Sequence, residues 1–118
     1  MGFFTAVTKV VEIDAANRVT IRKLTFEEQQ SVISSAMRVE ALQNGMTSAV
    51  VDAGVMALKQ TQLAVVSWEG PGFEGLPANP VNVGRLPAAI GQQLQAAVDA
   101  LNAGLSDAEK KASGTPTS

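Results

Sequence analysis

The fold is decided at residues 18–28, which read RVTIRKLTFEE. In its first half Val19 and Ile21 alternate with polar residues, which is the period-two pattern of a strand with one face against a core. Thr25 and Glu28 then form a capping box, because each side chain can accept a hydrogen bond from the other residue's backbone amide. The stretch therefore predicts a strand that passes directly into a helix.

A second strand is expected before this one. Residues 3–13 are rich in Phe, Val, Thr and Ile, which favour strands. Residues 14–17, Asp-Ala-Ala-Asn, read as a turn with Asp and Asn at its ends. Two such runs around a short turn predict a β-hairpin over about residues 3–24. An isolated hairpin is marginally stable, so its apolar face must pack on something.

Three helices are expected downstream, over residues 26–44, 47–65 and 87–103. Gly45 is interpreted as the stop of the first helix. The end of the second, residues 63–66, fits a short strand equally well, because periodicity does not separate the two over so few residues.

The stretch between the last two helices is expected to be a loop. Residues 67–79 are rich in Gly and Pro. Asn79 before a proline reads as a helix cap followed by the first helical position, so a short helical turn is expected over 80–85.

We therefore expect an α+β domain in which an N-terminal β-hairpin packs on a bundle of three to four helices. The length of 118 residues fits one domain, placed at residues 1–111. Residues 112–118 are small and polar and are predicted to form a flexible tail.

Composition excludes several classes of function. The net charge is −2, with nine basic residues scattered among eleven acidic ones, which argues against nucleic-acid binding. There is no Cys and no His, so thiolate metal sites, disulfides and the commonest general base are absent. No segment is apolar for the length of a membrane span. We expect no metal, no cofactor, no membrane partner and a cytoplasmic location.

Two motifs resemble functional sites without their context. Gly70-Pro-Gly-Phe-Glu-Gly75 matches the G-x-G-x-x-G pattern, but no helix follows at once, the proline lacks an amide and the glutamate would repel phosphate. The close carboxylate pairs, Glu27 with Glu28 and Glu69 with Glu74, have no His, Cys or Lys beside them. We expect a loop at the first and no catalytic residues at either.

The stretch 86–98 carries no charge, and glutamines stand where a solvated helix usually carries Lys and Glu. It is either an alanine-rich surface helix or a helix that docks on a partner or on a copy of itself. Trp68, the only tryptophan, is either a core residue that clasps a loop or an anchor for a partner. The candidate partner-binding or core residues are Trp68, Ile90, Leu94, Val98 and Leu101.

The order of these parts resembles that of the small tail assembly chaperones of long-tailed bacteriophages. The matching stretches are 19–28 leading into a helix, VVSWEG at 65–70, PVNVGRLP at 80–87 and VDALN at 98–102. The resemblance covers residues 18–111. This chain departs from it at residues 41–62, which contain few charged residues.

The resemblance implies a non-enzymatic assembly factor. It would bind the tape measure protein in the host cytoplasm, keep it soluble, help to recruit tail tube subunits and leave before the particle is complete. In many phages a frameshift yields a longer form of such a chaperone, for which the tail at 112–118 is a plausible junction.

Three alternatives to the chaperone stay open. The first is a structural minor tail or head–tail connector protein. The second is a toxin–antitoxin component or regulatory adaptor with no phage link. The third is an enzyme whose pocket converges on Glu69 and Glu74.

Overall fold

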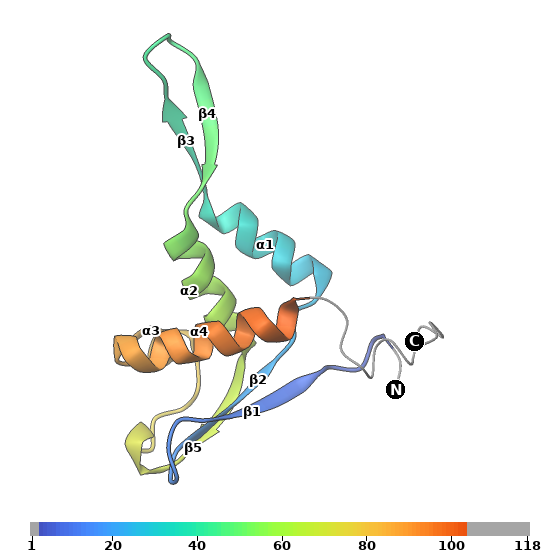
Figure 1. Ribbon diagram of the computed structural model, residues 1–118, viewed down its shortest axis with the longest axis vertical. Coiled ribbons are helices and arrows are strands. Elements are labelled where there is room, and N and C mark those ends of the chain that lie inside the picture. The colour runs from blue at the N-terminus through green and yellow to red at the C-terminus, as the bar shows by residue number, and fades with distance from the viewer. Residues whose placement is uncertain (1–2, 104–118) are drawn as a thin grey trace.

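The computed structural model describes residues 3–103, which form five strands, four α-helices and one short 3₁₀ helix (Figure 1). This arrangement confirms the expected α+β class. In chain order the elements are β1 Thr8–Glu12, β2 Arg18–Arg22, α1 Phe26–Ala36, β3 Met37–Ala41, β4 Thr47–Val51, α2 Ala53–Ala64, β5 Val65–Glu69, η1 Pro71–Phe73, α3 Pro80–Gly84 and α4 Ala88–Asn102.

The main sheet is antiparallel and has the strand order β1-β2-β5. The N-terminal hairpin confirms the expected one, although its strands are shorter than predicted. Asp14 closes the turn, because its carboxylate accepts from the backbone amides of Ala16 at 2.9 Å and Asn17 at 2.8 Å. Between β2 and β5 the register shifts after Thr20, which leaves an extra residue on β5.

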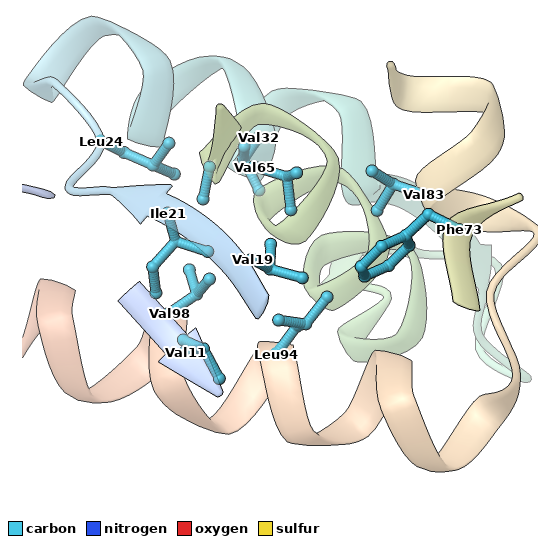
Figure 2. Packing of buried hydrophobic residues seen from close by; sticks show 11 residues of the cluster. Val11, Val19, Ile21, Leu24, Val32, Val65, Phe73, Val83, Leu94 and Val98 are labelled. Atoms are coloured by element: carbon cyan, nitrogen blue, oxygen red, sulfur yellow. The ribbon is translucent and has the colours of Figure 1, made fainter. Parts of the chain in front are cut away.

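The core lies between this sheet and α4. Val19 and Ile21 of β2 and Leu94 and Val98 of α4 are fully buried against one another, with Val11 of β1 beside them (Figure 2). The alternation of β2 and the helical spacing of α4 therefore face the same interior. The remaining members of the buried cluster are Leu24, Val32, Ala64, Val65, Phe73 and Val83.

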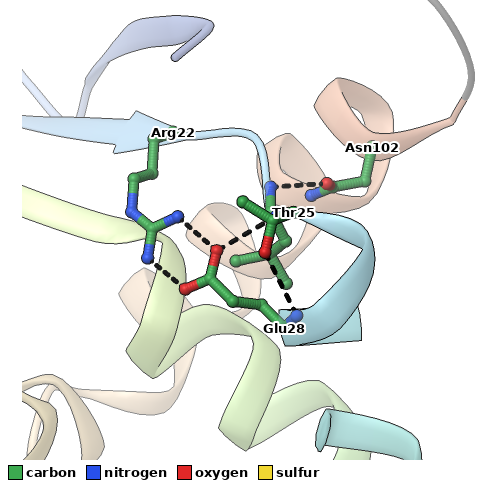
Figure 3. Close-up of polar contacts among 5 residues, drawn as sticks. Arg22, Thr25, Glu28 and Asn102 are labelled. Carbon is green, nitrogen blue, oxygen red and sulfur yellow. Dashed lines mark hydrogen bonds and ion pairs between the residues drawn. The ribbon is translucent and has the colours of Figure 1, made fainter. Parts of the chain in front are cut away.

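A polar junction fixes the passage from β2 to α1 (Figure 3). The predicted capping box is present, with Glu28 N donating to Thr25 Oγ1 at 3.2 Å and Thr25 N donating to Glu28 Oε1 at 3.0 Å. The Arg22 guanidinium also donates to both oxygens of Glu28, at 2.6 and 2.5 Å. Asn102 at the end of α4 accepts from Leu24 N at 2.9 Å, so three elements meet here.

The prediction of a helix over 26–44 is wrong beyond residue 36. The helix ends at Ala36, because Met37 adopts an extended backbone with φ −74° and ψ 139°. Residues 37–41 instead form β3, which pairs antiparallel with β4. Gly45, expected as a helix stop, is part of a hairpin turn at φ +81°.

The prediction of a helix over 47–65 is wrong at its beginning. Residues 47–51 form β4, and the helix begins only after Asp52, whose side chain accepts from Val55 N at 3.1 Å. Thr and Val are β-branched and favour the strand over the first turns of the expected helix. The helix ends at Ala64 and β5 follows from Val65, so the strand alternative for residues 63–66 is right for 65–66 and wrong for 63–64, which are helical.

The C-terminal elements agree with the sequence. Asn79 caps α3, accepting from Asn82 N at 2.8 Å, and α4 covers nearly all of the expected 87–103. The predicted tail at 112–118 and residues 104–111 lie outside the described residues.

Candidate functional site

The hairpin of β3 and β4, residues 37–51, projects from the body of the molecule, and we call it the projecting hairpin (Figure 1). Among the described residues its two strands contact each other extensively and no other element to a similar degree. No third strand joins them in that part of the chain. Both edges and both faces of this small sheet are therefore open to a partner.

One face of the projecting hairpin is apolar and exposed, and we call it the apolar face. Cross-strand partners project to the same side of a sheet, so the residues of the face are set by the register. Val39, for example, lies opposite Ala49 and is 71% exposed. The six residues of the apolar face, all exposed, are Met37, Val39, Ala41, Thr47, Ala49 and Val51.

The tip carries further exposed apolar side chains, which the alternation along β3 places on the other face of the hairpin. Leu42 N donates to Met46 O at 2.8 Å across an Asn44-Gly45 turn, and both apolar side chains are exposed. A glycine at positive φ suits such a tight hairpin turn. The turn thus presents further apolar side chains at the point farthest from the body.

The opposite face of the hairpin is charged on β3. Arg38 Nη2 lies 3.1 Å from Glu40 Oε1, and both side chains are about half exposed. Their cross-strand partners are Val50 and Ser48. Both charged residues of β3 therefore lie on this face beside apolar residues such as Val50, whereas the apolar face carries no charge.

A second surface of low charge lies between α2 and α4. A groove of about 580 Å³ is lined by small and uncharged residues of the two helices, with further residues from α3 and the segment before α4. Gln92 and Gln95 of the charge-free stretch lie in its wall, opposite Ala57 and Leu58. Part of the charge-free stretch 86–98 therefore lines this groove.

The predicted apolar stripe of α4 belongs to the core. Leu94 and Val98 are fully buried, so they are not available to a partner in this structure. Ile90 and Leu101 are partly buried and pack against the same cluster.

Trp68 clasps a loop. Its ring stacks on Phe73 with centroids 4.6 Å apart, and its Nε1 donates to the Leu76 carbonyl at 2.7 Å. The side chain is half-buried against the core. Of the two interpretations made from the sequence, the clasp is the arrangement that the structure contains.

The glycine-rich segment at residues 70–75 packs against the β1–β2 turn and does not form an open phosphate-binding loop. Gly72 N donates to Asn17 Oδ1 at 2.7 Å, which ties the segment to the β1–β2 turn. A Cβ on Gly70 would lie 2.4 Å from the Ala16 carbonyl oxygen. The glycines therefore allow a close approach between two loops.

One carboxylate from each close pair noted in the sequence forms an ion pair with an arginine. Glu28 is held by Arg22, whose hydrogen bonds lower the pKa of that carboxyl to about 2. Glu69 lies 3.2 Å from Arg18 Nε on the exposed surface. Within residues 3–103 no three His, Cys, Asp or Glu side chains converge on a metal position, and no helix there is long and apolar enough to cross a bilayer.

Comparison with known protein families, curated proteins and solved structures finds no match. The candidate site therefore rests on the geometry of this chain. Sequence reasoning missed the projecting hairpin, although a signal for it exists. Asn44-Gly45 is a strong hairpin turn, and Val39 and Ala49 belong to alternating runs on either side of it.

Proposed function

We propose that this protein is a tail assembly chaperone of a long-tailed bacteriophage, which holds the tape measure protein through the apolar face of the projecting hairpin. The observation that carries the proposal is the exposure of that face on an element with few contacts to the body. Contiguous exposed apolar surface marks interaction sites in soluble proteins. The resemblance in the order of parts supports the identity of the partner.

The chemistry of the hairpin suits a temporary, adaptable contact. Met37 of the apolar face is 51% exposed, and methionine side chains adapt to irregular apolar partners. A tape measure helix would bury its exposed apolar stripe against the apolar face. The uncharged groove between α2 and α4 offers a second place for such a helix.

The contact between the chaperone and the tape measure protein should also be reversible. A hairpin face is small compared with the interfaces of permanent complexes, so the chaperone can leave when tail tube subunits arrive. Under this proposal the protein acts in the host cytoplasm during assembly and is absent from the finished particle.

The test is co-expression with the tape measure protein of the same phage, followed by pull-down and measurement of its soluble fraction. Val39→Lys places a charge on the apolar face, and Val10→Lys is the matched control on an exposed strand residue of the main sheet. We expect the wild type and Val10→Lys to keep the tape measure protein soluble. Val39→Lys should lower its soluble fraction severalfold.

Two other results are informative. If the proteins do not associate and this chain is found in purified particles, a structural minor tail or head–tail connector role replaces the proposal. If they associate but Val39→Lys and Val10→Lys behave alike, the chaperone role stands and the hairpin is the wrong site.

A further inference from the structure

The outer edge of β3 carries a second inference, which does not depend on the tape measure protein. Successive residues in an antiparallel pair direct their backbone groups alternately toward the partner strand and away from it. Asp52 N donates to Ala36 O, and Leu42 N donates to Met46 O, both at 2.8 Å. The even-numbered residues of β3 therefore direct their backbone amides and carbonyls toward β4. Val39, which is odd-numbered, directs its amide and carbonyl to the outer edge.

The edge has no strand beside it among residues 3–103. Figure 1 shows β3 on the side of the hairpin away from α1. Ala41, like Val39, directs both backbone groups outward by the same alternation. Met37 directs its carbonyl outward, while its amide donates to Ser34 O at the end of α1.

The charges on this strand are self-complementary. Arg38 and Glu40 flank Val39 on the polar face. When two copies of β3 pair antiparallel about Val39, each Arg38 lies directly opposite Glu40 of the second copy. Opposite charges in such cross-strand positions stabilise a sheet, and like charges destabilise it.

The neighbouring registers are disfavoured by the same charges. A shift by one pair toward the base of the hairpin sets Arg38 against Arg38 of the second copy. A shift toward the tip sets Glu40 against Glu40. Only the register centred on Val39 satisfies both the backbone alternation and the charge pairing.

We propose that two copies of this chain associate by antiparallel pairing of β3 with β3, centred on Val39. The product is a sheet of order β4-β3-β3-β4. Because opposite residues project to the same side, the apolar faces of the two hairpins join into one surface of twice the width. The two backbone hydrogen bonds between the Val39 residues are related by the two-fold axis, which passes between them.

The association should be weak. The strand is five residues long, so the contact falls below the area of standard stable interfaces. We expect a dissociation constant on the order of 10–100 µM.

Sedimentation velocity over a range of concentrations tests the pairing through charge reversal. Arg38→Glu alone and Glu40→Arg alone set like charges opposite one another, so each should weaken association roughly tenfold or more. An equal mixture of the two variants restores both opposite-charge pairs and should form a heterodimer. The double variant Arg38→Glu/Glu40→Arg should again dimerise by itself.

The controls separate this pairing from other effects. Each single variant loses the ion pair within its own strand, so recovery on mixing reports only the contact between copies. Arg18→Glu reverses a charge of similar exposure in the main sheet and should leave association unchanged. Circular dichroism should show the same folded spectrum for all variants.

A protein that stays monomeric at the highest soluble concentration overturns the proposal. A dimer indifferent to the charges at 38 and 40 also overturns it, and places the contact on the apolar face, on β4 or elsewhere. Arg38 and Glu40 lie on the face opposite the apolar face, so their substitution does not alter the proposed binding site for the tape measure protein. Binding of the tape measure protein by the single variants can therefore be measured separately from dimerisation.

Discussion

The carbonyl of Ala36 accepts a hydrogen bond from the amide of Asp52 at 2.8 Å, and this bond closes the base of the projecting hairpin. The end of α1 and the beginning of α2 therefore meet at the base of the hairpin, and the two helices also pack against each other. The body and the hairpin should be separable, with the core in one and the candidate binding face in the other.

Replacing residues 38–50 with a short Gly-Ser linker should therefore leave the body folded. The hairpin contributes no residue to the buried cluster, so we expect the melting temperature to change by only about 3 °C. The same variant should no longer keep the tape measure protein soluble. Thermal unfolding by circular dichroism and the co-expression assay measure the two effects, and an unfolded variant would show that the hairpin supports the body.

Substitution of Trp68 should lower the free energy of unfolding and should not directly remove a contact with the tape measure protein. Trp68→Ala removes the stack on Phe73 and the bond to the Leu76 carbonyl, so we expect a loss of about 3 kcal/mol in the free energy of unfolding. Trp68→Phe keeps an aromatic ring and should lose about 1 kcal/mol. Urea denaturation followed by circular dichroism measures both. A Trp68→Ala variant of full stability that no longer binds the tape measure protein would restore the anchor interpretation.

The Arg22–Glu28 pair predicts a pH dependence. The pKa of Glu28 is about 2 in the folded protein, below its ordinary value of 4.5, because Arg22 donates to both oxygens of the ionised form. The stabilisation is therefore complete above pH 4.5 and is lost as the pH falls toward 2. A quarter of the side chain is exposed, so we expect a screened contribution of about 1–2 kcal/mol.

Denaturation of Glu28→Gln at several pH values measures this contribution. The stability difference from the wild type should be largest near neutral pH and should vanish toward pH 2. Glu27→Gln, at an exposed neighbouring residue outside the pair, is the control. A difference that does not vary with pH would contradict the assignment.

Two residues of the α4 stripe should respond differently to truncation. Leu94→Ala opens a cavity in a fully buried position and should cost about 3–4 kcal/mol. Leu101→Ala, at a partly buried position beside the core, should cost about half as much. Equal and small losses in both variants would mean that the stripe is not the core.

Alanine at Gly70 should be more costly than alanine at Gly45. Both glycines have positive φ, so each substitution strains the backbone by about 1 kcal/mol. Only at Gly70 would the new Cβ also collide with Ala16 and Asn17, which adds roughly 1–3 kcal/mol. Chemical denaturation of the two variants measures the difference, and equal losses would contradict the tight loop contact.

Local patterns determined much of this fold. The alternation of Val19 and Ile21, the capping box of Thr25 and Glu28 and the cap at Asn79 are each set by neighbours within a few residues, so the sequence predicts them correctly. The same applies to the extent of α4, which a proline and regular apolar spacing define.

The region 37–51 was predicted wrongly because local preference is divided there. Met37, Glu40 and Ala41 favour helix, whereas Val39 favours strand, and Asn44-Gly45 fits either a helix stop or a hairpin turn. Pairing with the Thr- and Val-rich strand across the turn resolves the conflict. That pairing joins residues as far apart as Met37 and Val51, beyond the reach of a helical window.

The sequence by itself determined which side chains are apolar, where the charges are missing and where chain direction changes. Only the tertiary structure decided which apolar surfaces are used internally. Leu94 and Val98 disappear into the core because α4 lies across β2, while Val39 remains in solvent because nothing in the described chain folds back over the hairpin. Burial depends on which elements meet in space. The pattern of apolar residues along the sequence is the same for a face that is buried in the core and for a face that stays exposed to solvent.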